Sequence, residues 1–228
     1  MSEAFVDARP PGNPWQALRK FVRSEASMQR AQSCELCTRA LSAEHQHLIE
    51  LAQRRLVCVC DACAVLFDQP AGARYRRVPR RIRLVSDFWL PDAAWGRLLI
   101  PINMAFFYRD TAAGRVVAMY PSPAGATESL PDDDAWQELL QNNPLLETLE
   151  SDVEALLVNR LGERFGFAAA ECYLLPIDRC FQLTGLVRTH WRGLSGGAEV
   201  WEQLRCFFAD LRAQAVVISA PAAEVRDA

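Results

Sequence analysis

The sequence predicts an α+β protein in which a small treble-clef or zinc-ribbon-like metal module packs on an antiparallel sheet with helices. Three observations predict this fold: two Cys-x-x-Cys pairs near the N-terminus, consecutive strand-like segments after residue 82, and a strongly amphipathic last helix. Strands followed by helices favour an α+β arrangement over a doubly wound parallel sheet. The 228 residues, 50% of them apolar, are enough to bury a sizeable core beside the module.

Residues 1–29 are expected to form an N-terminal tail and a lead-in helix. Asn13 would cap this helix and Pro14 would take its first position. The N-terminus lacks a basic start followed by an apolar stretch, and no apolar run approaches the roughly 18 residues of a membrane span. We therefore expect a cytoplasmic protein without a membrane span.

Residues 30–70 are expected to form a four-cysteine metal module. Its ligands would be Cys34 and Cys37 from the first pair, and Cys60 and Cys63 from the second. Thiolates three residues apart in a tight turn can point the same way, so two such turns supply the four sulfurs of a tetrahedral site. In a reducing compartment, clustered cysteines indicate a metal rather than disulfides.

Between the two pairs, residues 45–51 and 55–60 carry strand patterns and are joined by a turn short enough for a hairpin. Residues 61–67 then begin a helix. The order of a cysteine-bearing turn (Cys34 and Cys37), a hairpin and a helix is that of a treble-clef zinc module. In such a module Cys60 would end a strand and Cys63 would lie in the first helical turn.

Three further residues are alternative ligands. Cys58 lies two residues before Cys60, hence on the same strand face, and His45 and His47 also share a face. Any of them could replace one of the four cysteines. Zinc is the favoured ion; iron in a rubredoxin-like redox centre is the alternative, although Thr38 stands where a glycine usually follows the first pair.

Residues 71–81 read as an arginine-rich connector to the second domain. We expect it to be either a solvated linker or a docking surface for an acidic protein partner. The net charge of −3 and pI of about 5.7 argue against a general nucleic-acid binder. The four candidate partner-binding residues are Arg76, Arg77, Arg80 and Arg81.

Residues 82–215 are expected to form the α+β domain, followed by a C-terminal tail at 216–228. Its expected strands are residues 81–89, 95–110 and 114–123, the last two joined by a hairpin turn at 111–114. A loop at 123–134 would precede a helix over 135–149, interrupted at Asn142-Asn143-Pro144, and then a helix over 151–162.

The last part of the domain is expected to contain two strands within residues 170–191, with Pro176-Ile177-Asp178 as the turn between them. An amphipathic helix over 198–214 would close the fold. The apolar side chains that share one face of this helix are Val200, Leu204, Phe207, Phe208 and Leu211.

The sequence contains no readable catalytic set. His190 is the one histidine outside the metal module, and no nucleophile elbow, phosphate-binding loop or dinucleotide-binding motif accompanies it. A nuclease of the His-Asn-His type would need a second histidine or asparagine on the helix after Cys60, where only Asp68 approximates a ligand. We therefore expect a protein that is not an enzyme.

The motifs CELC, EHQHL, CVCDACAVLF, YRRVP, YPSPAGATES, the PID of YLLPIDRC, and GLVRTHWRGLSGG together resemble those of an uncharacterised bacterial family. The resemblance extends from about Cys34 to Leu211. The genes of that family resemble, in their setting, accessory genes of uptake NiFe hydrogenases. This implies a non-catalytic metal-binding accessory protein that supports assembly, maturation or operation of a hydrogenase, with a hydrogenase subunit or maturation factor as partner. Electron transfer by an iron centre is the alternative.

Overall fold

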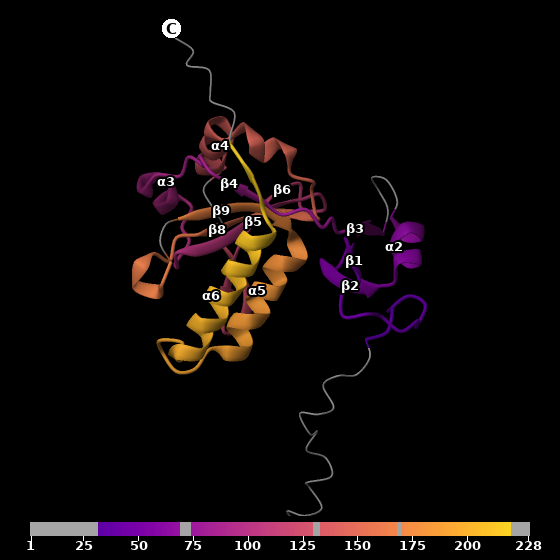
Figure 1. The fold of residues 1–228 in the computed structure, drawn as a ribbon. Helices are drawn as coiled ribbons and strands as arrows, with labels where there is room; N and C mark the ends of the chain where they lie inside the picture. The colour runs from indigo at the N-terminus through magenta and orange to yellow at the C-terminus, as the bar shows by residue number, and fades with distance from the viewer. Residues whose placement is uncertain (1–31, 69–73, 130–132, 168–169, 220–228) are drawn as a thin grey trace, which may run out of the picture.

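The computed structural model describes residues 32–68, 74–129, 133–167 and 170–219, which form two sheets with helices around them (Figure 1). The lead-in helix expected within residues 1–29 lies outside the described residues. The expected α+β class with antiparallel sheets is confirmed.

The smaller sheet belongs to the cysteine module and has the order β2-β1-β3. The strands β1 (Gln46–Glu50) and β2 (Arg55–Val59) form the expected hairpin, and the helix α2 (Asp61–Phe67) follows directly. The third strand, β3 (Tyr75–Arg77), comes from the arginine-rich connector and pairs with the free edge of β1. Part of the connector is therefore hydrogen-bonded sheet.

The larger sheet has seven strands in the order β10-β4-β9-β8-β5-β6-β7. Every pairing is antiparallel except that of β10 with β4, which is parallel. The expected hairpin between residues 95–110 and 114–123 is present as β5 and β6. The bounds are β4 Arg83–Val85, β5 Met104–Asp110, β6 Arg115–Ser122, β7 Gly125–Ser129, β8 Glu154–Asn159, β9 Glu171–Pro176 and β10 Val216–Ile218.

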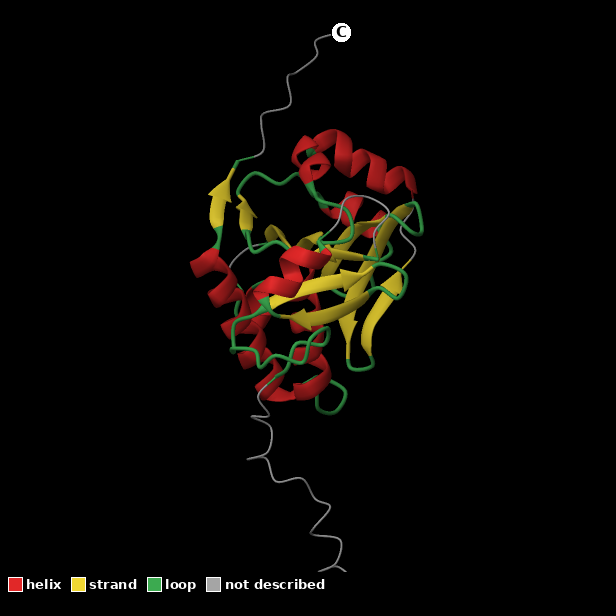
Figure 2. Ribbon diagram, turned by 90° about the vertical axis from the view of Figure 1, so that its right-hand side faces the viewer, coloured by secondary structure: helices red, strands yellow, loops and turns green. Residues whose placement is uncertain are grey.

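Helices lie on both faces of this sheet (Figures 1 and 2). The helices α5 (Ile177–His190) and α6 (Gly197–Gln214) pack on one face. On the opposite face lie α3 (Asp92–Arg97) and α4 (Asp133–Asn142). Short 3-10 turns follow α4 at Pro144–Thr148 and β8 at Glu163–Phe165. Within the described part of the chain, no helix combines the length and apolar character that a membrane crossing requires.

Alternate residues of the central strands supply two cores. Phe106 faces the core under α5 and α6, whereas Phe107 faces the core under α3 and α4, and both are fully buried. The predicted apolar face of α6 is confirmed, since all five of its side chains are buried. Ile49 of β1 also joins the core under α5 and α6, so the cysteine hairpin packs directly on the main domain.

The prediction of a helix over residues 151–162 is wrong. Residues 154–159 of this segment form β8, a central strand in which every residue is buried. A short apolar run buried on both faces shows no alternation, so periodicity cannot separate it from a buried helix. Asp152, near the start of this segment, accepts hydrogen bonds from the backbone N–H and the hydroxyl of Thr111.

The prediction of a second strand within residues 170–191 is also wrong. Pro176 ends β9 and immediately precedes α5, so Pro176-Ile177-Asp178 starts a helix instead of turning between two strands. The buried positions of α5 include Ile177, Cys180 and Val187, which share one helical face.

Several expected boundaries also change. Residues 123–134, expected to be a loop, contain the edge strand β7. The expected strand 95–110 contains part of α3 before β5 begins, and only three residues of the expected strand 81–89 form β4. Residues 216–218, expected in a C-terminal tail, form β10 and pair with β4.

Candidate metal centre

The four predicted cysteines come together from two local structures. Cys34 and Cys37 lie in a tight turn that is closed by a bridge between Ser33 and Ala40. Cys60 follows β2 at the cap position of α2, and Cys63 lies in the first turn of that helix. The hairpin places the helix start beside the turn, and Cys34, Cys60 and Cys63 share one small core with Leu48, Val57 and Val59.

The spacing of the sulfur atoms suits a tetrahedral ion. All four lie within 4.8 Å of one another, and the Sγ atoms of Cys37 and Cys60 are 3.7 Å apart. Zinc–sulfur bonds of about 2.3 Å in a tetrahedron place sulfurs about 3.8 Å apart, so only small movements separate this arrangement from a ligated one. Three of the cysteines are buried, whereas Cys37 is exposed. We call this group the four-cysteine site.

The electrostatics of the four-cysteine site favour a bound cation. Burial opposes ionisation of Cys34, but the N–H groups of Cys60, Cys37 and Leu36 point at its sulfur and lower its pKa to about 6. The Cys63 N–H likewise lowers the pKa of Cys60. Burial and the neighbouring sulfurs raise the pKa of Cys63 to about 12. Four thiolates therefore repel one another here unless a positive ion lies between them.

Thr38 occupies the position after the first cysteine pair where a glycine was expected. Its φ is 61°, the left-handed conformation that glycine adopts without strain, and its N–H donates a 2.8 Å hydrogen bond to the carbonyl of Cys34. The turn therefore forms although the glycine is missing. The four sulfurs could hold zinc or iron.

The alternative ligands lie on the other face of the hairpin. His47 pairs directly with Cys58 across β1 and β2, and these residues alternate with Leu48 and Val57, which face the four-cysteine site. His45 lies just before β1 on the same side as His47, and their rings are in edge contact. The structure therefore gathers these three residues into a separate group and does not bring them to the four cysteines.

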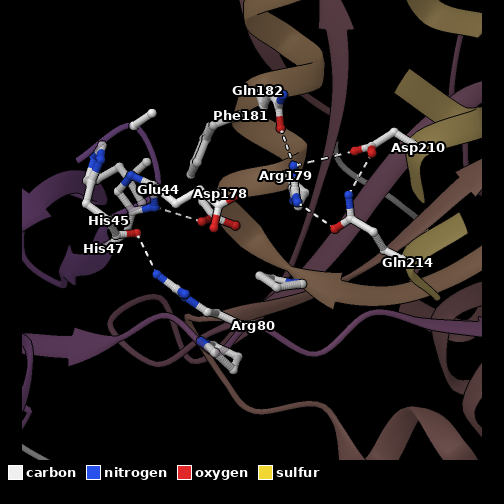
Figure 3. Close-up of a pocket in the computed structure, with 14 residues that line it drawn as sticks. Glu44, His45, His47, Arg80, Asp178, Arg179, Phe181, Gln182, Asp210 and Gln214 are labelled. Atoms are coloured by element: carbon white, nitrogen blue, oxygen red, sulfur yellow. Dashed lines mark hydrogen bonds and ion pairs between the residues drawn. The ribbon is translucent and has the colours of Figure 1, made fainter. Parts of the chain in front are cut away.

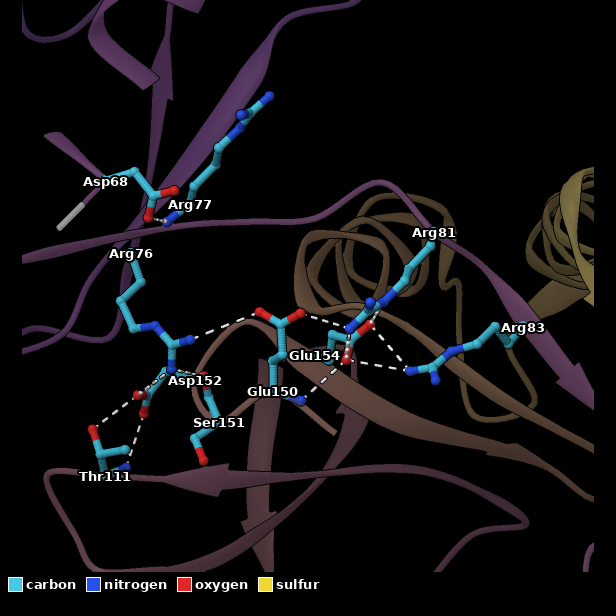
Figure 4. Close-up of polar contacts among 10 residues, drawn as sticks. All are labelled: Asp68, Arg76, Arg77, Arg81, Arg83, Thr111, Glu150, Ser151, Asp152 and Glu154. Atoms are coloured by element: carbon cyan, nitrogen blue, oxygen red, sulfur yellow. Dashed lines mark hydrogen bonds and ion pairs between the residues drawn. The ribbon is translucent and has the colours of Figure 1, made fainter. Parts of the chain in front are cut away.

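Two of the four arginines predicted to bind a partner are held by carboxylates of the main domain (Figure 4). Arg81 contacts Glu150 at 2.6 Å and the fully buried Glu154 at 2.7 Å. Arg76 donates to the Ser151 carbonyl at 2.6 Å and lies 3.8 Å from Glu150. These two guanidinium groups hold the arginine-rich connector against the start of β8.

The other two arginines are exposed. Arg77 donates to the side-chain oxygen of Gln46 at 3.2 Å, and Arg80 donates to the His45 carbonyl at 3.2 Å. Among the residues that the structure describes, neither has a carboxylate within ion-pair distance. Their positive charges are therefore the part of the predicted docking surface that no acidic side chain in the described structure neutralises.

The sequence interpretation missed Asp178. We expected it in a turn, but it lies in the first turn of α5, and its Oδ2 is 2.8 Å from Nδ1 of His47. The sequence could not predict this contact, because the two residues are far apart in the chain and meet only when α5 packs beside the hairpin. His190 is remote from this group and contacts Glu199.

Comparison with known proteins identifies a family but no activity. A model described as a family of unknown function, DUF5947, matches residues 33–215, which include both cysteine pairs, the connector and the whole large sheet except β10. No curated protein and no solved structure matches the chain.

Proposed function

The chain belongs to the DUF5947 family of unknown function, and from that premise we propose that it is a non-catalytic metal-binding protein that acts by contacting another protein. The observation that carries the proposal is the convergence of four cysteine sulfurs at spacings that suit a tetrahedral ion. Four protein ligands leave no open position for a substrate or an activated water. Such a closed site stabilises the fold and does not catalyse.

We propose zinc as the ion and a treble clef as the type of module. In support, only the first cysteine pair lies in a tight turn, whereas the second lies where a strand passes into a helix. A rubredoxin-like iron centre that transfers electrons is the alternative, since the backbone N–H groups around Cys34 would also stabilise an iron–thiolate centre.

The proposed partner is a subunit or maturation factor of a NiFe hydrogenase. Its identity rests on the resemblance in gene setting. Two features of the module favour a protein contact: the apolar side chains of Val65 and Leu66 on α2 are each 68% exposed, and β3 beside α2 carries Arg77. An acidic, partly apolar surface would complement this face.

Metal analysis tests the first part of the proposal. Protein purified without added metal and dialysed against EDTA should retain one tightly bound zinc ion, and Cys34→Ser should lose it. Cys172→Ser is the matched control, because Cys172 is buried in the main domain away from the module. Finding no metal and freely titratable Cys34 and Cys60 would refute the site. Red protein with bound iron would instead establish the redox alternative.

A pull-down tests the second part. Tagged protein from its native host, grown with hydrogen as electron donor, should retain a hydrogenase component, and Arg77→Glu or Arg80→Glu should weaken that retention at least tenfold. Arg188→Glu is the control, because Arg188 is exposed on α5. Equal retention by all variants would exclude these two arginines from docking. Capture without any hydrogenase component would refute the proposed partner.

A further inference from the structure

A second cluster of metal-binding side chains lies between the cysteine module and the main domain. It consists of His45, His47 and Cys58, whose potential ligand atoms all lie within 4.8 Å of one another. His45 lies just before β1, His47 lies in β1, and Cys58 is the residue of β2 directly opposite His47. Antiparallel pairing holds His47 and Cys58 on one face, so this spacing is set by the hairpin itself.

The hydrogen bonds of both imidazoles leave the same nitrogen available. Nδ1 of His45 is 3.0 Å from the Ser42 carbonyl oxygen, which can only accept, so Nδ1 carries the proton. In the neutral ring Nε2 then has a free lone pair. This Nε2 is buried and has no hydrogen-bond partner among the residues that the structure describes. A buried acceptor without a partner lowers stability, and a bound cation would offset this cost.

Asp178 holds the second imidazole in the equivalent state. Its Oδ2 accepts a 2.8 Å hydrogen bond from Nδ1 of His47, which leaves Nε2 of His47 as the ligand atom (Figure 3). In metal sites, a carboxylate often accepts a hydrogen bond from the ring N–H that does not bind the metal. This hydrogen bond orients the ring and makes the ligating nitrogen more basic. The other oxygen, Oδ1, is buried and likewise has no partner in the described structure.

We propose that His45, His47 and Cys58 bind a second divalent transition-metal ion, with Asp178 as the positioning residue for His47. Two imidazole nitrogens and one thiolate suit zinc, cobalt or nickel, whereas calcium and magnesium require oxygen ligands. The three ligands leave a fourth position. His45, His47 and Asp178 also line a cavity of about 840 Å³, so this position is accessible to water or a small exogenous ligand.

The location gives this ion a different role from that of the four-cysteine site. All three ligands belong to the module, whereas Asp178 belongs to α5 of the main domain. Binding would therefore strengthen the contact between the two parts. An open three-ligand site also binds less tightly than a closed four-thiolate site, so the second ion should be removed by EDTA under conditions that leave the first in place.

Cobalt titration of EDTA-treated, full-length protein tests the proposal. Wild type should take up one equivalent of Co²⁺ with visible d–d bands and a thiolate-to-cobalt charge-transfer band, while zinc in the four-cysteine site stays silent. His45→Gln and His47→Gln should each bind at least tenfold more weakly, and Cys58→Ser should lose the charge-transfer band. His190→Gln is the matched control and should titrate as wild type.

Asp178→Asn separates positioning from ligation. It should keep the stoichiometry and the charge-transfer band but weaken cobalt binding about 10- to 100-fold. The measured quantity is the difference in uptake between wild type and the histidine variants, so it remains readable even if the four-cysteine site holds no zinc. Circular dichroism of each variant checks its folding. Equal uptake by wild type and both histidine variants, or no uptake by wild type, would overturn the second site.

Discussion

Thr38 carries backbone strain in the turn that holds the first cysteine pair. Its φ of 61° lies in the left-handed region, which costs a residue with a side chain roughly 1–2 kcal/mol. The threonine is exposed, and its hydroxyl donates a 2.7 Å hydrogen bond to the carbonyl of Cys37. The turn is therefore held by its surroundings and not by the preference of the residue in it.

Replacing Thr38 by glycine should relieve this strain. The larger chain entropy of glycine in the unfolded state offsets about 0.5–1 kcal/mol of the gain, so Thr38→Gly should raise the free energy of unfolding by about 0.5–1 kcal/mol. Urea unfolding of the metal-loaded protein measures it. Thr38→Ala keeps the strain and should show no gain. A less stable glycine variant would mean that the hydroxyl contributes more than the strain costs.

Glu154 is a buried charge on which Arg81 of the connector and Arg83 of β4 converge. Burial opposes its ionisation, but the guanidinium of Arg81, the N–H of Glu150 and the charge of Arg83 hold the pKa of this carboxyl below its usual range. A depressed folded-state pKa gives stability that is complete above the unfolded-state value of about 4.3. This stability disappears as the pH falls through the folded-state value.

The free energy of unfolding should therefore be constant near neutral pH and fall below about pH 4. Glu154→Gln should lose about 2–3 kcal/mol at pH 7, because it removes a charged hydrogen-bond acceptor, and should show a weaker acid dependence than wild type. Urea unfolding at several pH values measures both effects. Glu147→Gln, at an exposed position, is the control. If Glu154→Gln showed the same acid dependence as wild type, other carboxyl groups would be responsible for the loss of stability at low pH.

At the scale of the elements, β8 decides the architecture of the large sheet. It lies between β9 and β5, and its successive residues face opposite cores: Leu156 faces α3 and α4, and Leu157 faces α5 and α6. A surface helix would expose one of its faces, whereas a central strand buries both. Adjacent positions should therefore be equally sensitive to substitution.

Leu156→Ala and Leu157→Ala should each lower the free energy of unfolding by about 2–5 kcal/mol, because each removes a fully buried side chain and leaves a cavity. Leu194→Ala is the matched control; this side chain is 103% exposed and should change stability by less than about 0.5 kcal/mol. Chemical denaturation provides the measurement. If one of the two β8 variants were as stable as the control, that position would not be in the core.

At the scale of the whole molecule, the module and the main domain share contacts that should make them unfold together. Ile49 of β1 packs in the core under α5 and α6, and Arg54 at the hairpin turn forms an ion pair with the buried Asp110 of β5. The N–H of Val78 also bonds to the His47 carbonyl beside this interface. A metal ion bound at the four-cysteine site should therefore stabilise more than its own module.

Loss of the four-cysteine ion should lower the melting temperature of the main domain. Cys63→Ser removes a buried ligand, and a loss of even about 2 kcal/mol lowers the melting temperature of a domain of this size by about 4–8 °C. Tryptophan fluorescence reports it, because the described tryptophans (Trp89, Trp95, Trp136, Trp191 and Trp201) all lie in the main domain. Cys206→Ser, at an exposed position, should melt as wild type. An unchanged transition in Cys63→Ser would show that the module unfolds independently.

Features that depend on neighbouring residues could be predicted from the sequence alone. Two short spacings predict the four-cysteine cluster, a strand pattern predicts the β1–β2 hairpin, and an apolar face predicts α6. The structure contains each of these three features. Each is built within one short stretch of chain, where residue spacing translates directly into geometry.

Features that depend on burial by distant segments could be recognised only once the three-dimensional fold was known. The runs that became β8 and α5 are apolar on more than one face, so their local patterns fit either a strand or a helix until the sheet around them is known. His47 and Asp178 meet through packing of α5 on the hairpin, and Arg81 reaches Glu154 through the path of the connector. Sequence spacing carries no information about such contacts, because they are set by which surfaces the whole chain must bury.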